Sequence, residues 1–297
     1  MPEPISDAFR AFDALVRPAA DDLDDSAGFR DGVEAALRGR PGIIGIEPAG
    51  SFSHGTAVRG SRLDLLVVLD GPRSRSATRA AESLAAAVPG DVVTAALGSV
   101  STAAGRVVLD RVGGIGLHLI PAYAREDSQW VPDAAGRWVR HRPGAREMLL
   151  DRIDDDGSLR ALIRLLLAWK HRQGVPVSSY YLETAAIRQS LQQRSFSLLW
   201  DLCWLWESLA SGGLVNLPDL SSPDQTQGVR PAASLGRAIE VQFPVERAAS
   251  SARGAVNAYL DGDLDTAHAY LVALFGGDFP ELAPAEPVGW DAPPDPL

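Results

Sequence analysis

The chain of 297 residues has 46% hydrophobic and 22% charged residues and a formal net charge of −10. This length allows either one large lobe or two modest ones, each with its own hydrophobic core. The acidic balance excludes a surface that binds nucleic acid nonspecifically, because such binding needs clustered cations that displace counterions. We therefore expect no nucleic-acid partner.

The hydrophobic pattern excludes two further classes of protein. The sequence has no apolar run of the roughly 18 residues that a membrane-spanning helix needs. Its first residues, MPEPISDAF, lack the basic start and the apolar stretch of a secretory signal. We expect a cytoplasmic protein that does not associate with a membrane.

The predicted elements, taken in chain order, change from mixed to purely helical. Apolar residues at helical spacing predict two amphipathic helices at 5–16 and 29–37. Short apolar runs predict strands at 43–47, 63–70, 92–97, 106–110 and 115–121, with one helix at 75–88. After a Gly-, Pro- and Trp-rich stretch, helical periodicity predicts helices at 145–153, 158–173, 178–193, 195–210, 231–261 and 263–274.

This order of elements predicts an α+β protein with two lobes. We expect a mixed-sheet lobe that includes the N-terminal helices at 1–150, and a helical C-terminal lobe at 151–297. A cleft between two such lobes is a common place for a ligand. We expect a small-molecule ligand there, and a protein partner is also open.

The stretch AGSFSHGTAVRGSRLDLLVVLD at 49–70 carries the most informative pattern. A Gly-Ser pair after a strand, here Gly50 and Ser51, lets the backbone turn tightly and points amide groups into a concavity. Such concavities commonly hold a phosphate anion. Gly55 and Thr56 repeat the pattern five residues later.

The stretch resembles the signature of DNA-polymerase-β-type nucleotidyltransferases, in particular the bacterial cyclic-oligonucleotide synthases of the cyclic GMP-AMP synthase group. In that family a Gly-Ser and a Gly-Thr precede Ser-Asp-x-Asp, and a third Asp lies on a later strand before Pro-Ala. Here the matching segments are SRLD at 61–64 and HLIPA at 118–122, and further similarity reaches LFGGDFP at 274–280. The resemblance implies a nucleotidyltransferase lobe with a mixed sheet, followed by a helical lobe.

The resemblance also implies a site in which three carboxylates hold two divalent metals for phosphoryl transfer. Only Asp64 keeps its carboxylate, because Arg62 stands at the first position and His118 at the third. Magnesium needs oxygen ligands, and a fixed arginine cation repels it. We therefore predict no metal and no cofactor, with Arg62, Asp64 and His118 as the candidate catalytic residues.

Candidate ligand-binding residues come from the glycine-rich stretch and from the helix pair at 161–183. The resemblance leads us to expect a phosphate-contacting lysine at Leu167, whereas Lys170 matches the lysine of the family's Trp-Lys pair. The full candidate set is Gly50, Ser51, His54, Gly55, Thr56, Lys170, Ser178, Ser179 and Tyr180.

Three functions are open, and with them whether the protein is an enzyme. The first is a nucleotidyltransferase-fold protein that has lost metal-dependent synthesis of cyclic oligonucleotides and binds a ligand or partner in the former active-site cleft. The second is an enzyme repurposed for metal-independent acid-base or cyclisation chemistry on a non-nucleotide small molecule, with His118 and Asp64 exchanging protons and Arg62 holding an anion. The third is an active nucleotidyltransferase with an unusual metal site.

A structural interpretation of the same three residues is also open. Arg62 and Asp64 could form a salt bridge that fills the old metal cavity, with His118 hydrogen-bonded beside them.

Overall fold

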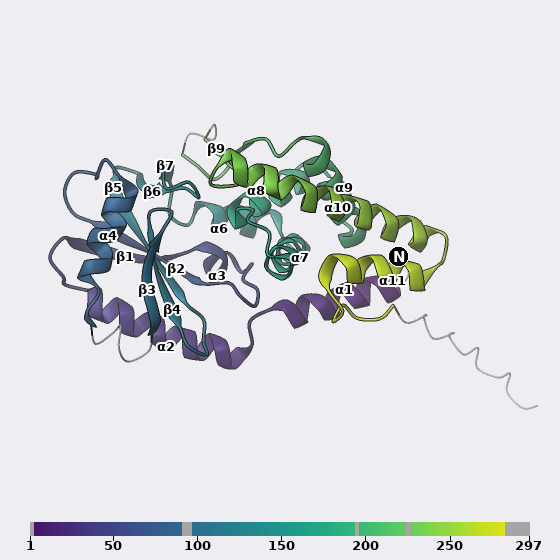
Figure 1. Cartoon of the computed structure of the whole chain (residues 1–297), viewed down its shortest axis with the longest axis horizontal. Helices are drawn as coiled ribbons and strands as arrows, with labels where there is room; N and C mark the ends of the chain where they lie inside the picture. Colours follow the sequence, from purple (N-terminus) through teal and green to yellow (C-terminus); the bar gives the residue numbers. More distant parts are fainter. Residues whose placement is uncertain (1–2, 91–96, 194–195, 224–226, 283–297) are drawn as a thin grey trace, which may run out of the picture.

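The structure is a computed structural model that describes residues 3–90, 97–193, 196–223 and 227–282. A sheet with covering helices forms one part of the molecule, and a group of helices forms the other (Figure 1). Within the described residues, no helix is both long enough and apolar enough to span a membrane.

The chain begins with α1 (Glu3–Val16), which packs in the helical part, and the first part then contains α2 (Ala20–Leu37), β1 (Ile43–Ala49), α3 (Gly50–His54), β2 (Leu63–Leu69), α4 (Ala77–Ala87), β3 (Leu97–Ala103), β4 (Arg106–Arg111), β5 (Leu117–Arg125), β6 (Ser128–Pro132) and β7 (Trp138–His141). The second part contains α6 (Ala145–Ile153), α7 (Ser158–Gln173), α8 (Ser179–Ser190), α9 (Leu198–Ser211), β8 (Leu217–Pro218), β9 (Gly228–Val229), α10 (Leu235–Leu260) and α11 (Leu264–Phe275).

The seven-stranded sheet has the order β1-β2-β5-β4-β3, and β6 and β7 extend it from β5. Strands β2 and β5 run parallel, whereas the other strand pairs are antiparallel, so the sheet is mixed. Alternate residues of β2 and β5, such as Leu65 and Leu119, pack against α2 and α4 in one core. The intervening residues therefore lie on the opposite face of the sheet.

The second core gathers the helices from α6 onward, and it also contains α1. Phe9 and Phe12 of α1 are fully buried and pack against the rings of Phe275 and Phe279. Although α1 was expected in the first lobe, its apolar face is buried in the helical part instead. Sequence spacing predicted the amphipathic helix but could not tell which core its apolar face would enter.

The other differences from the predicted elements are local. Residues 50–54 form a short helix where we expected a turn, and the Trp-rich stretch forms the β6–β7 hairpin, in which Trp138 packs edge-on against Tyr123. The strand predicted at 92–97 lies outside the described residues except for Leu97, where β3 begins. The helix predicted from 231 begins at Leu235, because the Ser234 side chain caps it by accepting from the Arg237 amide.

Candidate functional site

Asp64 and His118 meet on the sheet face opposite α2 and α4. They are directly paired in the parallel register of β2 and β5, and His118 Nδ1 lies 2.8 Å from Asp64 Oδ1. Each side chain is 21% exposed. Because an ionised carboxylate only accepts hydrogen bonds, Nδ1 carries the proton in this pair. His118 Nε2 has no hydrogen-bond partner in the described part of the chain.

Arg62 turns away from this pair. Its Nη1 lies 2.6 Å from Asp110 Oδ1 on β4, so the salt bridge considered between Arg62 and Asp64 is absent from the described structure. The hydrogen bond from Arg62, with a second from Ser99, lowers the pKa of the Asp110 carboxyl below its ordinary value. Asp110 was missed by sequence reasoning, because only the strand register brings it to the same face as His118.

The glycine-rich stretch packs closely against the Asp64 carboxylate. Gly50 has a φ of +72°, and a Cβ there would overlap this carboxylate, lying 2.8 Å from its Cγ. Only glycine fits at this position. Gly55 ends α3 in a left-handed conformation with φ +71°, and Thr56 donates its amide to the Ser51 carbonyl at 2.9 Å. Gly50 and Gly55 thus stand at the two ends of α3, both with left-handed backbone.

Lys170 brings a cation to the site from the helical part. Its Nζ donates to Ser179 Oγ at 2.6 Å. Burial and the positive charge of Arg106 lower the pKa of Lys170 to about 8, although the charge of Asp64 opposes this shift. Arg106, on β4, was another residue missed from the sequence. Its Nε is buried and has no hydrogen-bond partner among the described residues.

Neighbouring positions on α7 and α8 have structural roles. Leu167 is 1% exposed in the helical core, so a lysine at this position would be buried among apolar side chains. The Ser178 side chain caps α8 by accepting from the Tyr181 amide. Tyr181 is a core residue that donates its hydroxyl to the Val215 carbonyl at 2.9 Å.

Three predicted ligand-binding side chains lie instead in a polar network centred on Glu183. Thr56 donates to Glu183 Oε1 at 2.5 Å, and His54 Nδ1 lies 3.1 Å from Oε2. The ring of Tyr180 lies under the Arg146 guanidinium, 3.5 Å from its Cζ. The structure thus gives His54, Thr56 and Tyr180 partners within the protein.

The network connects α3 to α6 and α8. Arg146 of α6 reaches Glu183 at 3.5 Å and Asp219 at 3.0 Å, and both partners are almost fully buried. Burial alone would raise the pKa of Glu183, but the charge and hydrogen bond of His54, together with Arg146, lower it to about 2. Glu183, the single charged residue of the run YYLETAAI at 180–187, was the sequence signal for this network.

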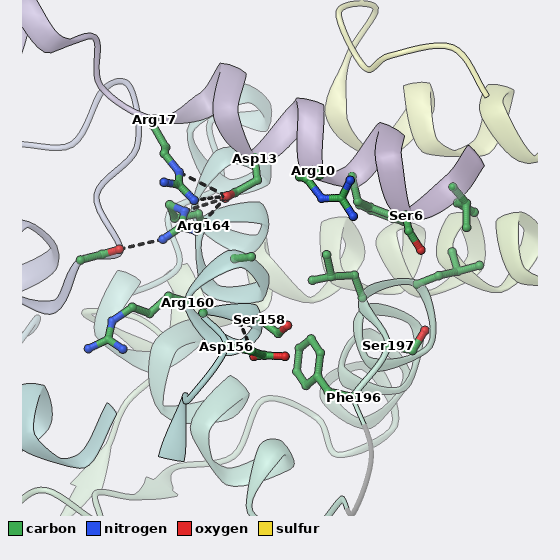
Figure 2. A pocket seen from close by; sticks show the side chains of 17 residues that line it. Ser6, Arg10, Asp13, Arg17, Asp156, Ser158, Arg160, Arg164, Phe196 and Ser197 are labelled. Carbon is green, nitrogen blue, oxygen red and sulfur yellow. Dashed lines mark hydrogen bonds and ion pairs between the residues drawn. The ribbon is translucent and has the colours of Figure 1, made fainter. Parts of the chain in front are cut away.

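A cavity of 680 Å³ lies elsewhere, between α1, α7 and the residues before α9 (Figure 2). It has several arginines, but these are already paired: Arg17 and Arg164 converge on Asp13, and Arg160 is paired with two further carboxylates. Burial would raise the pKa of Asp13, yet the hydrogen bonds and charge of Arg164 bring it below its ordinary value. The cavity therefore presents little free positive charge, and we place the candidate site at Asp64 and His118.

The sequence matches no protein-family model and no curated protein. Solved structures do resemble it. CdnC of E. coli MS115-1, solved with ATP, has a TM-score of 0.73 and 16% identity, covering 92% of this chain and 98% of its own. The CD-NTase CdnG of Bradyrhizobium diazoefficiens, solved with GTP, has a TM-score of 0.64 and 14% identity, covering 93% and 96%.

A third similar structure is the cyclic AMP-GMP synthase DncV of Vibrio cholerae, solved with a linear intermediate. Its TM-score is 0.58 at 14% identity, with 80% of this chain and 70% of its own covered. These likenesses extend over both the sheet and the helical part. They confirm the predicted α+β nucleotidyltransferase architecture, and the chain has the CD-NTase fold.

Proposed function

We propose that this protein has lost metal-dependent cyclic-oligonucleotide synthesis and binds an anionic small molecule without a divalent metal. The ligand lies between the sheet face of Asp64 and His118 and the start of α8. Its anionic group contacts Lys170, Ser179 and Arg106. The observation that carries the proposal is the partner of Lys170, which is a hydroxyl group, with no carboxylate at ion-pair distance in the described structure.

The residues present do not fit the two metals that the resemblance implies. Asp64 is the one carboxylate left from the three, and one of its oxygens already accepts from His118. The nearby Asp110 is bound by Arg62. Among the described residues, no group of three or more His, Cys, Asp or Glu side chains is arranged to hold a metal ion. Magnesium requires about six oxygen ligands.

The cations of the site suit an anion better than a metal. Lys170 and Arg106 lie close enough for the charge of Arg106 to act on the Lys170 pKa. An anion between them would relieve this repulsion and give the buried Arg106 Nε a hydrogen-bond acceptor. CdnC and CdnG were solved with ATP and GTP, so nucleotides are reasonable first probes alongside inorganic pyrophosphate.

Calorimetric titration in EDTA tests the proposal, with pyrophosphate, ATP and GTP as probes. We expect at least one probe to bind the wild type and to bind Lys170→Gln at least tenfold more weakly, since a charged hydrogen bond contributes about 1.5–3 kcal/mol. Arg10→Gln is the matched control, because Arg10 is exposed and its ion-pair partner is the exposed Asp7. A nucleotide product that forms with magnesium or manganese and disappears in Asp64→Ala would overturn the proposal.

The hydrogen bond between His118 and Asp64 favours a second function, acid-base chemistry on the bound molecule. Asp64 orients the ring, and Nε2 is the nitrogen that would exchange the proton. This function requires that His118→Gln abolish turnover of a substrate while its binding remains. Equal loss of binding and turnover would instead make His118 a binding residue.

A further inference from the structure

Lys170 is the single lysine of the chain, in which arginine supplies the other strongly basic side chains. It is half-buried in the last turn of α7, and its Nζ donates to Ser179 Oγ, at the start of α8, over 2.6 Å. In the described part of the chain, no carboxylate lies at ion-pair distance from Nζ. Lysine and arginine can both hold an anion, but a buried lysine can also lose its proton and act as a nucleophile.

The surroundings of Lys170 favour the neutral amine. Burial removes water from the ammonium group, and the positive charge of Arg106 repels it, although the charge of Asp64 acts in the opposite sense. The pKa of Lys170 is therefore lowered to about 8. About one tenth of the amine is then neutral at pH 7, against less than about 0.1% for an ordinary lysine. Burial and a neighbouring cation are the two conditions that activate lysines to form imines with carbonyl compounds.

Arg106 offers a place for the charged end of such a compound. Its Nε is buried and has no hydrogen-bond partner among the described residues, so an anionic group could accept from it. The effect of its charge on the Lys170 pKa places the guanidinium near the amine. A molecule with a carbonyl group and a phosphate or carboxylate group would use both residues.

We propose that Lys170 binds an anionic aldehyde or ketone covalently, as an imine, while Arg106 binds its anionic group. The Nζ lone pair attacks the carbonyl carbon, and the C=O π electrons move to the oxygen. Both amine protons then pass to this oxygen, which leaves as water when the C=N bond forms. The inference rests on the proposed function, since the same residues hold the anion. A plain anion such as pyrophosphate binds the protonated lysine, whereas the carbonyl compound reacts with the neutral one.

Labelling of the full chain with pyridoxal phosphate, followed by borohydride, tests the proposal. Borohydride reduces an imine to a stable secondary amine, and peptide mass spectrometry separates a label on Lys170 from one on the N-terminal amine. We expect Lys170 to be labelled and pyrophosphate to prevent the reaction. Arg106→Gln should slow it at least about tenfold, because the charged hydrogen bond to the phosphate is lost.

The double variant Lys170→Arg/Arg10→Lys is the matched control, because it moves the single lysine to an exposed position beside Asp7. At neutral pH this exposed lysine should react at least about tenfold more slowly than Lys170 in wild type, since its amine is almost fully protonated. Pyridoxal, which has the same aldehyde without the phosphate, should show a smaller preference for Lys170. Circular dichroism checks that each variant is folded.

Calorimetry with pyrophosphate separates failure of this inference from failure of the proposed function. If pyrophosphate binds but Lys170 reacts no faster than the lysine of the control, the imine is wrong and the proposed function stands. Labelling of Lys170 that neither pyrophosphate nor Arg106→Gln reduces would overturn the role of Arg106. If pyrophosphate and the nucleotide probes do not bind and Lys170 is not labelled, both proposals are wrong.

Discussion

Gly50 lies directly against the carboxylate of Asp64, so the first glycine of the predicted phosphate turn packs on the acidic residue of the candidate site. The residue has a φ of +72°, and a side chain there would overlap the Asp64 carboxylate. The same carboxylate accepts a hydrogen bond from His118. The turn and the dyad therefore form one unit, and disturbing Gly50 should disturb both.

Replacing Gly50 by alanine should destabilise the protein by about 2–4 kcal/mol in the free energy of unfolding. Left-handed backbone at a non-glycine residue costs about 1–2 kcal/mol, and the overlap with Asp64 adds to that. Chemical denaturation of Gly50→Ala measures the loss.

Gly144→Ala separates the two contributions. Gly144 has a φ of +69°, but a Cβ there would meet no atom within 4 Å. The Gly144→Ala variant should therefore lose only the cost of a left-handed backbone, about 1–2 kcal/mol of the free energy of unfolding. Adding Asp64→Ala to Gly50→Ala should restore part of the lost stability, because the overlapping group is gone. Equal losses in Gly50→Ala and Gly144→Ala would show that Asp64 does not restrict this position.

Binding of an anion should weaken as the pH rises through the pKa of Lys170. Because that pKa is lowered to about 8, the lysine loses its charge between about pH 7 and 9. Calorimetry with pyrophosphate should show a fall in affinity over this range in wild type. Lys170→Arg is the matched control, and its affinity should stay constant because arginine remains protonated.

Stability should respond to the same titration with the opposite sign. Between the folded pKa of about 8 and the ordinary 10.5, the unfolded chain binds more protons at Lys170 than the folded one. Stability therefore rises with pH over this window. Lys170→Met should lack this rise. A wild-type affinity that does not change between pH 7 and 9 would contradict the placement of Lys170 at the anion.

The sequence predicted which strands carry Asp64 and His118. It did not predict the contact between Arg62 and Asp110, which depends on how neighbouring strands are aligned. Asp64 and His118 were expected on neighbouring strands, and the structure pairs them directly. The partner of Arg62 is Asp110, whose place depends on how β4 aligns with β5. No local pattern contains that alignment, because short antiparallel strands can pair in several registers.

The spacing of apolar residues predicted where the helices lie. It did not predict which neighbours each polar side chain on those helices contacts. Leu167 and Lys170 lie one turn apart on α7, yet the first enters the core and the second reaches Ser179. His54 and Tyr180 were expected to face a ligand, and both contact the network of Glu183 and Arg146 instead. A buried charge network forms only when distant segments meet, so its partners are absent from any one window of sequence.

Removing the charge of Glu183 should weaken the connection between α3 and the helical part. Glu183→Gln leaves Arg146 with one carboxylate partner and leaves a single acceptor oxygen where Thr56 and His54 each contact their own. Breaking a buried ion pair costs about 3–5 kcal/mol. We expect a loss near the lower end, measured by denaturation at neutral pH. Asp7→Asn, at an exposed pair with Arg10, should lose less than about 1 kcal/mol.

The acid limb of the stability curve gives the same network a second readout. The pKa of Glu183 is lowered from 4.5 to about 2, so its stabilisation is fully present above pH 4.5 and is lost as the pH falls toward 2. Wild type should therefore lose stability more steeply than Glu183→Gln over this window. Parallel curves for the two proteins would show that Glu183 is not held ionised by its neighbours.

Replacing Arg62 and His118 by aspartate should make the melting temperature depend on a divalent metal, as it does not in wild type. In wild type, Arg62 holds Asp110 and His118 holds Asp64, so millimolar magnesium or manganese should leave the melting temperature unchanged. The variant Arg62→Asp/His118→Asp has four carboxylates on one sheet face, those of Asp64, Asp110 and the two new aspartates. Without metal it should melt lower than wild type, because like charges repel and Asp110 loses its partner.

Metal should then raise the melting temperature of this variant, since binding at ten times the dissociation constant adds about 1.4 kcal/mol to stability. EDTA should reverse the effect. Arg62→Asn/His118→Asn is the matched control, with side chains of the same size and no charge, and it should not respond. If wild type responded to metal as strongly as the restored variant, Arg62 would not be the residue that keeps the metal out, and the metal-free site proposed here would be wrong.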